Sequence, residues 1–249
     1  MPEEPRPSSV PEYLRVPWGP WRALLVFTLV WIGIPLAIIL VTRVLAPYSS
    51  ATHWFLDGLI NNNIQALIIE VGIQTVISFA FIYYLVRQSG AKLSSLGWRG
   101  FNIWRALGLF VIIFLVFTIG VNLLLYLVTV LIPGFNVNQA QTNDFTGNVA
   151  IQHPVISILA LVIIPPIIEE TTFRGFIFPA LSKRFGTIFG AISSSLLFGL
   201  AHLQGNVTVY TFFLGLLLCY LYTKTRSIFP GMGIHMLNNY LAFIALAGK

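Results

Sequence analysis

Side chains able to carry out chemistry stand together in one apolar stretch, IIPPIIEETTFRGF, at residues 163–176. The stretch holds two adjacent carboxylates, Glu169 and Glu170, and the guanidinium group of Arg174. Ionisable side chains are unfavourable inside a membrane, so their presence in such a segment indicates a functional site. Glu170 and Arg174 are four residues apart and can form a buried ion pair on one helical face. Glu169 points about 100° away from that face and has no partner on its own helix.

Two polar motifs follow: FGLAH ends at His202, and HMLNN runs from His235 to Asn239. A lone histidine in a membrane helix more often packs against, or hydrogen-bonds to, a neighbouring helix. Depth favours a catalytic role here, because Glu169 lies 17 residues before Gly186 and His202 lies 16 residues after it. At about 1.5 Å per residue, both would stand roughly 24 Å above that turn. We therefore predict that Glu169 and His202 approach within about 3–6 Å and that His235 and Asn239 point into the same cavity.

Such a set of side chains could hydrolyse a peptide bond with an activated water molecule. A carboxylate in a low-dielectric site can act as a general base, so Glu169 would deprotonate the water while His202 orients it. His235 and Asn239 would donate hydrogen bonds to the developing oxyanion. The sequence has no H-E-x-x-H pattern, so the usual zinc-protease helix is absent.

The composition is that of a membrane protein. The 249 residues are 57% hydrophobic and 9% charged, whereas soluble domains carry roughly 25% charged residues. The net charge of +6 comes from basic residues scattered at segment ends, which indicates helix orientation rather than nucleic-acid binding. The single cysteine, Cys219, excludes a disulfide framework and a cysteine-based metal cluster.

Seven apolar segments are candidates for membrane helices: residues 22–46, 64–86, 104–132, 155–184, 187–201, 207–222 and 228–247. The sequence predicts an all-α, polytopic membrane helix bundle of seven transmembrane helices, or eight if Pro165–Pro166 divides the fourth segment. Residues 1–21 are predicted to be a disordered cytoplasmic tail and residues 22–249 the transmembrane bundle. Residues 46–63 and 133–154 are interpreted as polar loops. Basic residues concentrate in alternate connections, which predicts a cytoplasmic N-terminus in the cell membrane.

The motifs resemble those of the CPBP family, which contains type II CAAX prenyl endopeptidases and bacteriocin-processing or bacteriocin-immunity membrane proteins, often called Abi. That family shows E-E-x-x-x-R, F-x-x-x-H and H-x-x-x-N on successive core helices, and here they stand at 169–174, 198–202 and 235–239. FRGF at 173–176 and LGW at 96–98 match as well. The resemblance covers residues 155–240 and implies a bundle of about eight membrane helices with intramembrane endopeptidase activity. It assigns water activation to Glu169 and His202, and oxyanion stabilisation to His235 and Asn239.

The resemblance leaves cofactor and substrate open. Family members are often labelled metalloproteases, so a divalent metal such as zinc stays an alternative, with Glu169, His202 and His235 as candidate ligands. The expected substrates are peptide precursors or prenylated proteins with a CAAX-type C-terminus. Two other functions remain: a non-catalytic bacteriocin-immunity protein on the same scaffold, and a proton-coupled transporter, which the lack of repeated halves disfavours. Glu70, with Gln74 on its face, is expected to form an interhelical hydrogen bond rather than to catalyse.

Overall fold

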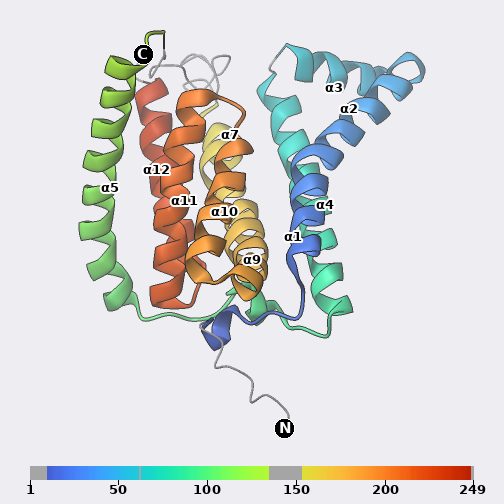
Figure 1. Ribbon diagram of the computed structural model, residues 1–249. Coiled ribbons are helices and arrows are strands. Elements are labelled where there is room, and N and C mark those ends of the chain that lie inside the picture. The colour runs from blue at the N-terminus through green and yellow to red at the C-terminus, as the bar shows by residue number, and fades with distance from the viewer. Residues whose placement is uncertain (1–9, 62, 135–152, 248–249) are drawn as a thin grey trace.

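The computed structural model describes residues 10–61, 63–134 and 153–247, and this part of the chain is an all-α membrane bundle (Figure 1). Five segments are long and apolar enough to cross a membrane: Pro20–Tyr48, Gln65–Gln88, Ile103–Leu131, Pro154–Phe185 and Gly205–Thr225. The apolar helix α10 (Thr187–Leu200) is shorter, and α12 (Phe229–Ala247) carries the polar HMLNN motif. All seven predicted segments are therefore helical, with ends that differ by a few residues from the sequence-based bounds.

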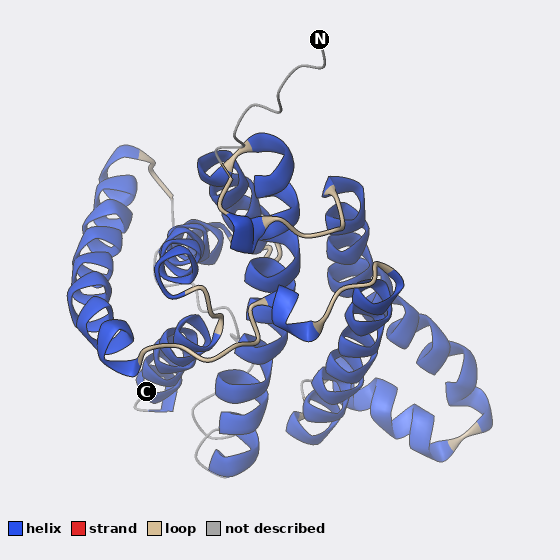
Figure 2. Ribbon diagram, turned by 90° about the horizontal axis from the view of Figure 1, so that it is seen from below, coloured by secondary structure: helices blue, strands red, loops and turns tan. Residues whose placement is uncertain are grey.

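The helices form a central group with further helices on two sides (Figure 1). The central group contains α7 (Pro154–Ser157) to α9 (Phe178–Phe185), together with α10, α11 (Gly205–Thr225) and α12. On one side α5 (Ile103–Leu131) stands against α11. On the other side stand α1 (Pro20–Thr28), α2 (Ile34–Leu45), α3 (Ser50–Ile60) and α4 (Ile64–Gln88). Figure 2 looks onto the end that carries the N-terminal segment, where loops connect the side helices to the central group.

Three π-helical segments interrupt the α-helices of the described chain, and each ends two residues before a proline. They are η2 (Leu29–Gly33) before Pro35, η5 (Ile158–Ile163) before Pro165, and η6 (Thr171–Ile177) before Pro179. In an α-helix a proline ring clashes with the carbonyl four residues earlier and offers that carbonyl no N–H. A wider π turn moves the carbonyl away from the ring. The tandem Pro165–Pro166 therefore does not divide the fourth segment, which is helical from Pro154 to Phe185.

A π turn followed by proline leaves one backbone carbonyl without a hydrogen-bond donor. A group on another helix must supply that donor. In η2 the N–H of Ile34 donates to Leu29 O, and Pro35 has no N–H to offer Val30 O. Nε2 of Gln74, on α4, donates to Val30 O at 3.1 Å. The side-chain amide thus replaces the missing backbone donor and joins α4 to the first membrane segment.

The described N-terminal residues 10–21 pack against the bundle, whereas the sequence predicted a disordered tail over residues 1–21. Val10, Leu14, Val16 and Trp18 are buried. The indole of Trp18 stacks on Phe176 with ring centroids 4.6 Å apart, and its Nε1 donates to Phe176 O at 3.0 Å. Burial of these four apolar side chains holds the segment against the bundle, although its proline-rich composition suggested disorder. Residues 1–9 lie outside the described part of the chain.

The predicted loop at residues 46–63 contains the helix α3. Ser49 caps this helix by accepting the N–H of Thr52 at 3.4 Å, and Asn63 caps α4 by accepting the N–H of Gln65 at 2.9 Å. Such caps satisfy donors that the first turn of a helix leaves free. The prediction of a loop is therefore wrong for residues 50–60, because polar residues interpreted as loop signals are helix caps. Most of the second predicted loop, at 135–152, lies outside the described residues.

The LGW and FRGF motifs pack two distant segments against each other. The short helix η4 (Leu93–Leu96) lies against η6, where a Cβ added to Gly175 would stand 2.6 Å from Leu96 O. Gly97 follows with φ of +79°, a left-handed conformation that glycine adopts without strain. Nε1 of Trp98 then donates to Oγ1 of Thr171 at 3.2 Å. These contacts fix the helix that carries Glu169 and Glu170.

We expect Gly175→Ala to lower the free energy of unfolding by about 1–3 kcal/mol, because its methyl group would overlap Leu96 O. Gly72→Ala is the matched control, since Gly72 is on α4 and an added Cβ there would meet nothing within 4 Å. The control change should leave stability equal or higher, because alanine is the better helix former. Thermal unfolding of both variants in one detergent measures the difference, and equal melting temperatures would contradict this close packing.

Candidate functional site

The candidate site begins with an ion pair on one continuous helix. Glu170 ends α8 (Ile164–Glu170) and Arg174 lies in η6, the next segment of the same helix. Nη1 of Arg174 lies 2.9 Å from Oε1 of Glu170, and both side chains are 1% exposed. A spacing of four residues places the two groups one above the other on the helix surface. The arginine thus supplies the positive charge that a fully buried carboxylate needs.

His235, on α12, lies between the two carboxylates. Its Nδ1 is 3.2 Å from Glu170 Oε1, and its Nε2 is 3.4 Å from Glu169 Oε2. The two glutamates therefore fix the orientation of the His235 ring, and Glu169 finds on another helix the partner that its own helix lacks.

The two glutamates differ in their access to solvent. Glu170 is 0% exposed and its Oε1 already faces both Arg174 and His235. Glu169 is 8% exposed, and its one charged neighbour within ion-pair distance among the described residues is His235. Glu169 is therefore the less enclosed carboxylate of the pair.

Phe198, the first residue of the FGLAH motif, contacts Arg174, His202 and His235 through its ring. The guanidinium carbon of Arg174 lies 4.3 Å from the centre of its ring. The rings of His202 and His235 approach Phe198 edge-on, with centroids 5.0 and 5.6 Å away. Phe198 itself is 0% exposed. The sequence identified this residue only as part of a motif, and the structure shows that it packs against members of all three motifs.

His202 lies in the turn that follows α10. Its Nδ1 is 2.8 Å from Phe198 O, so Nε2 is the ring nitrogen left for a ligand. Within the described residues no direct hydrogen bond joins His202 to Glu169. The predicted water-mediated approach of these side chains stays a prediction.

Asn239 bonds to a carbonyl that the tandem proline leaves without a donor. Leu161 O would receive its helical hydrogen bond from residue 165 or 166, four or five positions later, and both are prolines without an N–H. Nδ2 of Asn239 donates to Leu161 O at 3.0 Å. Asn239 therefore ties α12 to the helix of the two glutamates, one turn beyond His235.

A short hydrogen-bonded network holds the Asn239 amide. Nδ2 of Asn238 donates to Oδ1 of Asn239 at 3.3 Å, and the hydroxyl of Tyr210, on α11, donates to Oδ1 of Asn238. The network reaches from α11 through α12 to η5. Sequence reasoning missed Tyr210 and Asn238, and the signal that could have found Asn238 is its place beside Asn239 in a membrane helix.

We expect Asn239→Leu to destabilise the protein by about 1–3 kcal/mol, because Leu161 O would lose its donor. The loss should shrink in a Pro165→Ala background, since that change restores an N–H four residues after Leu161. Asn122→Leu, on α5, is the control. Nδ2 of Asn122 donates to Thr118 O at 2.7 Å, but that carbonyl keeps its own helical donor. Melting temperatures of the four variants measure the coupling, and equal losses with and without Pro165 would contradict the assigned role.

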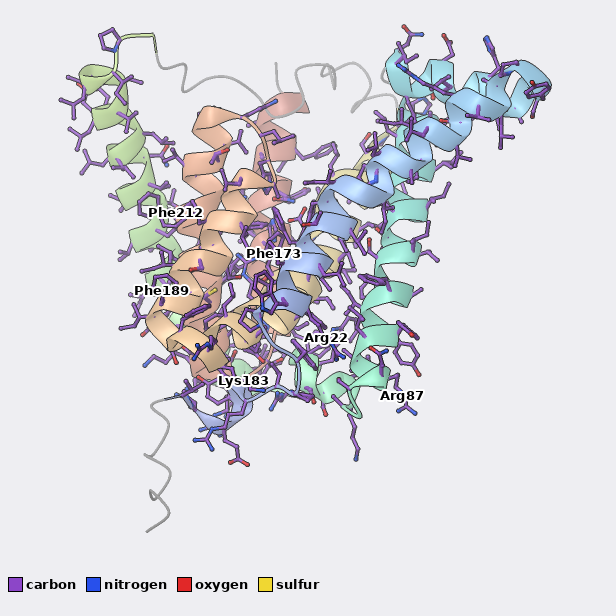
Figure 3. The ribbon with its side chains drawn as sticks, turned by 45° about the vertical axis from the view of Figure 1, so that its right-hand side comes forward. Arg22, Arg87, Phe173, Lys183, Phe189 and Phe212 are labelled. Atoms are coloured by element: carbon purple, nitrogen blue, oxygen red, sulfur yellow. The ribbon has the colours of Figure 1, made fainter. Side chains whose placement is uncertain are left out.

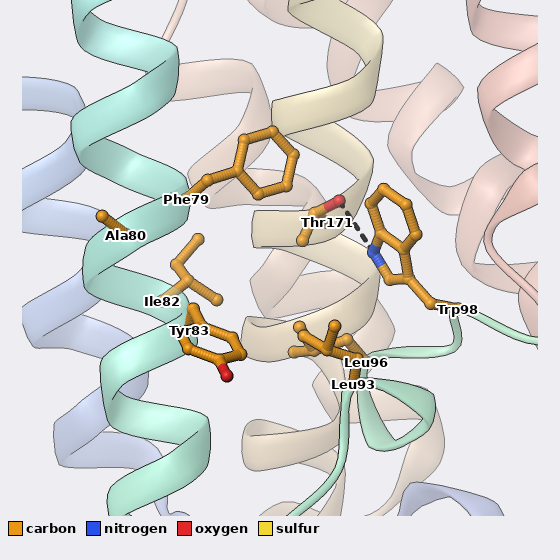
Figure 4. A pocket seen from close by; sticks show the side chains of 8 residues that line it. All are labelled: Phe79, Ala80, Ile82, Tyr83, Leu93, Leu96, Trp98 and Thr171. Atoms are coloured by element: carbon orange, nitrogen blue, oxygen red, sulfur yellow. Dashed lines mark hydrogen bonds between the residues drawn. The ribbon is translucent and has the colours of Figure 1, made fainter.

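An apolar cavity of about 300 Å³ opens beside the site, between α4 and η4 (Figure 4). Its walls include Phe79, Tyr83, Leu96 and Trp98, and Thr171 closes it on the side of the core helix. Thr171 directly follows Glu170 in the chain. The cavity therefore places an apolar space against the helix that carries both carboxylates.

Glu169, His202 and His235 are the three candidate metal ligands. Nδ1 of His202 lies 2.8 Å from Phe198 O and Nδ1 of His235 lies 3.2 Å from Glu170 Oε1, which leaves Nε2 of each ring and the carboxylate of Glu169 as the atoms that could bind a metal. In the described chain no group of three or more histidine, cysteine, aspartate or glutamate side chains is arranged to hold a metal ion. The mechanism proposed below uses the side chains alone.

Comparisons with known proteins place the motif region in a family. Residues 151–241 match the family described as "Type II CAAX prenyl endopeptidase Rce1-like". The "Putative membrane peptidase YdiL" of Bacillus subtilis (strain 168) is 32% identical over 95 residues. That match spans 38% of this chain and 38% of the curated relative. No solved structure matches the chain significantly.

Proposed function

We propose that the chain is a membrane-embedded endopeptidase of the CPBP family, because residues 151–241 match the type II CAAX prenyl endopeptidase Rce1-like family. The observation that carries the proposal is the placement of His235 between Glu169 and Glu170. It leaves Glu170 held by Arg174 and His235, and Glu169 oriented by His235 alone among the described residues and slightly less buried than Glu170. A curated relative named as a membrane peptidase supports the same activity.

In the proposed reaction Glu169 takes a proton from a water molecule, and the resulting hydroxide attacks the carbonyl carbon of the scissile peptide bond. Nε2 of His202 orients this water, since its Nδ1 is held at Phe198 O. When the bond to nitrogen breaks, Glu169 passes its proton to the leaving amine. The reaction therefore consumes one water and leaves the carboxylate in its starting state.

Two groups on α12 stabilise the oxyanion in this proposal. The amide Nδ2 of Asn239 has two hydrogens, of which one is donated to Leu161 O and the other remains for the substrate. The contact of His235 Nε2 with Glu169 is 3.4 Å, longer than an ordinary hydrogen bond. His235 can therefore exchange this contact for the developing negative charge. Donors aimed at such a charge often provide the largest catalytic contribution.

The substrate is proposed to be a peptide or protein with an apolar part that lies in the bilayer. The apolar cavity at Thr171 supports this, because it would take a prenyl chain or apolar side chains next to the helix of the carboxylates. Prenylated CAAX-type proteins and peptide precursors are the two substrate classes that we propose. A non-catalytic immunity role on the same scaffold is the second candidate, and measured turnover separates it from the first.

We propose that the end of the bundle with the N-terminal segment faces the cytoplasm. Arg22, Arg87 and Lys183 all lie toward this end (Figure 3). Basic residues are retained on the cytoplasmic side of membrane proteins. Protease protection of a tag placed after residue 249 and of one placed before residue 1 would test this orientation.

The activity is tested with the purified full chain on a farnesylated CAAX peptide, the same peptide without its lipid, and a panel of peptide precursors. Wild type should cleave at least one class, and Glu169→Ala should not. Cleavage should persist after treatment with a strong chelator such as 1,10-phenanthroline. Failure of wild type on all three classes would favour the immunity role, and loss of activity on chelation with recovery on added zinc would contradict the metal-free mechanism.

A further inference from the structure

A polar cavity of about 470 Å³ lies at the N-terminal end of the bundle, away from the two glutamates. Three separate segments line it: the N-terminal segment with Arg15, the η4 region with Ser94, Ser95 and Arg99, and the turn between α11 and α12 with Arg226. The cavity thus gathers three guanidinium groups, the hydroxyl groups of two serines and the side chain of Tyr13. It is also lined by one carboxylate, that of Glu12.

The three guanidinium groups keep most of their hydrogen-bond donors available. In the described chain none of them forms an ion pair with a carboxylate, and Glu12 does not form one either. Nε of Arg15 donates to Val10 O at 3.2 Å, and the Arg226 guanidinium lies 5.5 Å from the ring centre of Tyr13. Nε of Arg99 is buried without a hydrogen-bond partner. Since each guanidinium carries five N–H donors, the cavity holds a surplus of donors and positive charge.

The cavity walls are fixed to one another. The hydroxyl of Tyr13 donates to Thr223 O at 3.2 Å, which holds the N-terminal segment against the end of α11. Oγ of Ser227 donates to Arg99 O at 2.7 Å, which holds the η4 region against the start of α12. The arginines therefore stand at the rim of a structured cavity rather than on independent mobile loops.

We propose that this cavity binds a phosphate group. The planar fork of a guanidinium matches two phosphate oxygens, and serine hydroxyls supply further donors. Basic residues such as Arg22, Arg87 and Lys183 lie toward the same end of the bundle (Figure 3), where lipid headgroups would lie. The expected source of the phosphate is the headgroup of an anionic phospholipid, because basic pockets at the membrane surface recognise such headgroups. A bound phosphate would join the N-terminal segment, the LGW region and the start of α12.

The test uses the purified full chain in phosphatidylcholine nanodiscs. Melting temperature is measured as the mole fraction of phosphatidylglycerol rises, and separately as inorganic phosphate is added with no anionic lipid. The site variant is Arg15→Gln/Arg99→Gln/Arg226→Gln. The control is Arg87→Gln/Lys92→Gln/Arg184→Gln, which removes three positive charges near the same end from residues outside the cavity.

We expect saturable stabilisation of the wild type by phosphatidylglycerol, and a half-saturation point raised by about tenfold or more in the site variant alone. Stabilisation by inorganic phosphate that the site variant also loses would support a phosphate site with a soluble source. Equal losses in site and control variants would overturn the proposal, since they indicate diffuse attraction to a charged surface. No stabilisation of the wild type in either arm would overturn it as well.

A second variant covers the case in which the triple glutamine change prevents folding. Arg15→Lys/Arg226→Lys keeps both charges, at two exposed positions, but removes the forked geometry. Binding to a phosphate through bidentate contacts should weaken in this variant, whereas attraction by charge alone should stay the same. An unchanged half-saturation point would therefore overturn the proposal.

Discussion

Glu169→Gln is expected to lower the rate of peptide hydrolysis by roughly 10²–10⁴-fold while the protein still folds and inserts. Glutamine has nearly the same size as glutamate but cannot take a proton from water. Its amide oxygen can still face Nε2 of His235, which lies 3.4 Å from Glu169 Oε2 in the wild type. Turnover on the best substrate and melting temperature, both measured in one detergent, give the two quantities to compare.

Glu70→Gln is the matched control for this prediction. Glu70 is a second carboxylate within a membrane helix, but it lies on α4, outside the candidate site. Its removal should leave the rate near that of the wild type. Wild-type cleavage by Glu169→Gln would refute the assignment of the base. A similar loss in both variants would mean that the rate depends on membrane carboxylates in general and not on Glu169.

Arg174→Ala is expected to destabilise the protein by about 3–5 kcal/mol, because it leaves Glu170 as a buried charge without its main partner. The change also removes the guanidinium that lies 4.3 Å from the ring centre of Phe198. His235 is bonded to the same oxygen of Glu170, so its orientation should loosen too. We expect lower expression, a lower melting temperature and lost activity.

Arg184→Ala serves as the control, because Arg184 is an exposed arginine in α9. Its replacement should change the melting temperature little, as most exposed substitutions do. Arg174→Lys should give an intermediate result, since lysine keeps the charge but loses the planar group above Phe198. A fully stable but inactive Arg174→Ala variant would instead place Arg174 in the chemistry.

The membrane segments and the pairing of Glu170 with Arg174 could be predicted because both depend on local periodicity. Apolar length sets the position of a membrane helix, and a spacing of four residues sets which neighbours on it can touch. Nearly equal residue counts on either side of Gly186, 17 and 16, also predicted a common depth for Glu169 and His202. Residue counts give only the depth of a residue in the membrane. They do not determine how each helix is rotated about its axis.

For that reason the contacts between helices could not be predicted from the sequence. The rotation of α12 places His235 between two glutamates that precede it by more than sixty residues, and hydropathy does not determine that angle. The bond from Asn239 to Leu161 O depends on a π turn that sequence patterns did not indicate. The packing of Trp18 on Phe176 was missed because composition was weighed over the individual apolar residues of the N-terminal segment.

The tandem proline also has a consequence for the order of synthesis. The segment with Pro165–Pro166 leaves the ribosome before α12 exists, and domains generally form from the N-terminal side first. Until α12 arrives, Leu161 O lacks the amide of Asn239, and the two glutamates lack His235. The packing of α12 therefore supplies the hydrogen-bond donor for Leu161 O and, at the same time, places the histidine of the proposed active site. A nascent chain without α12 would carry both carboxylates in the bilayer without an assembled site, so the proposed activity would begin only when the last described helix packs.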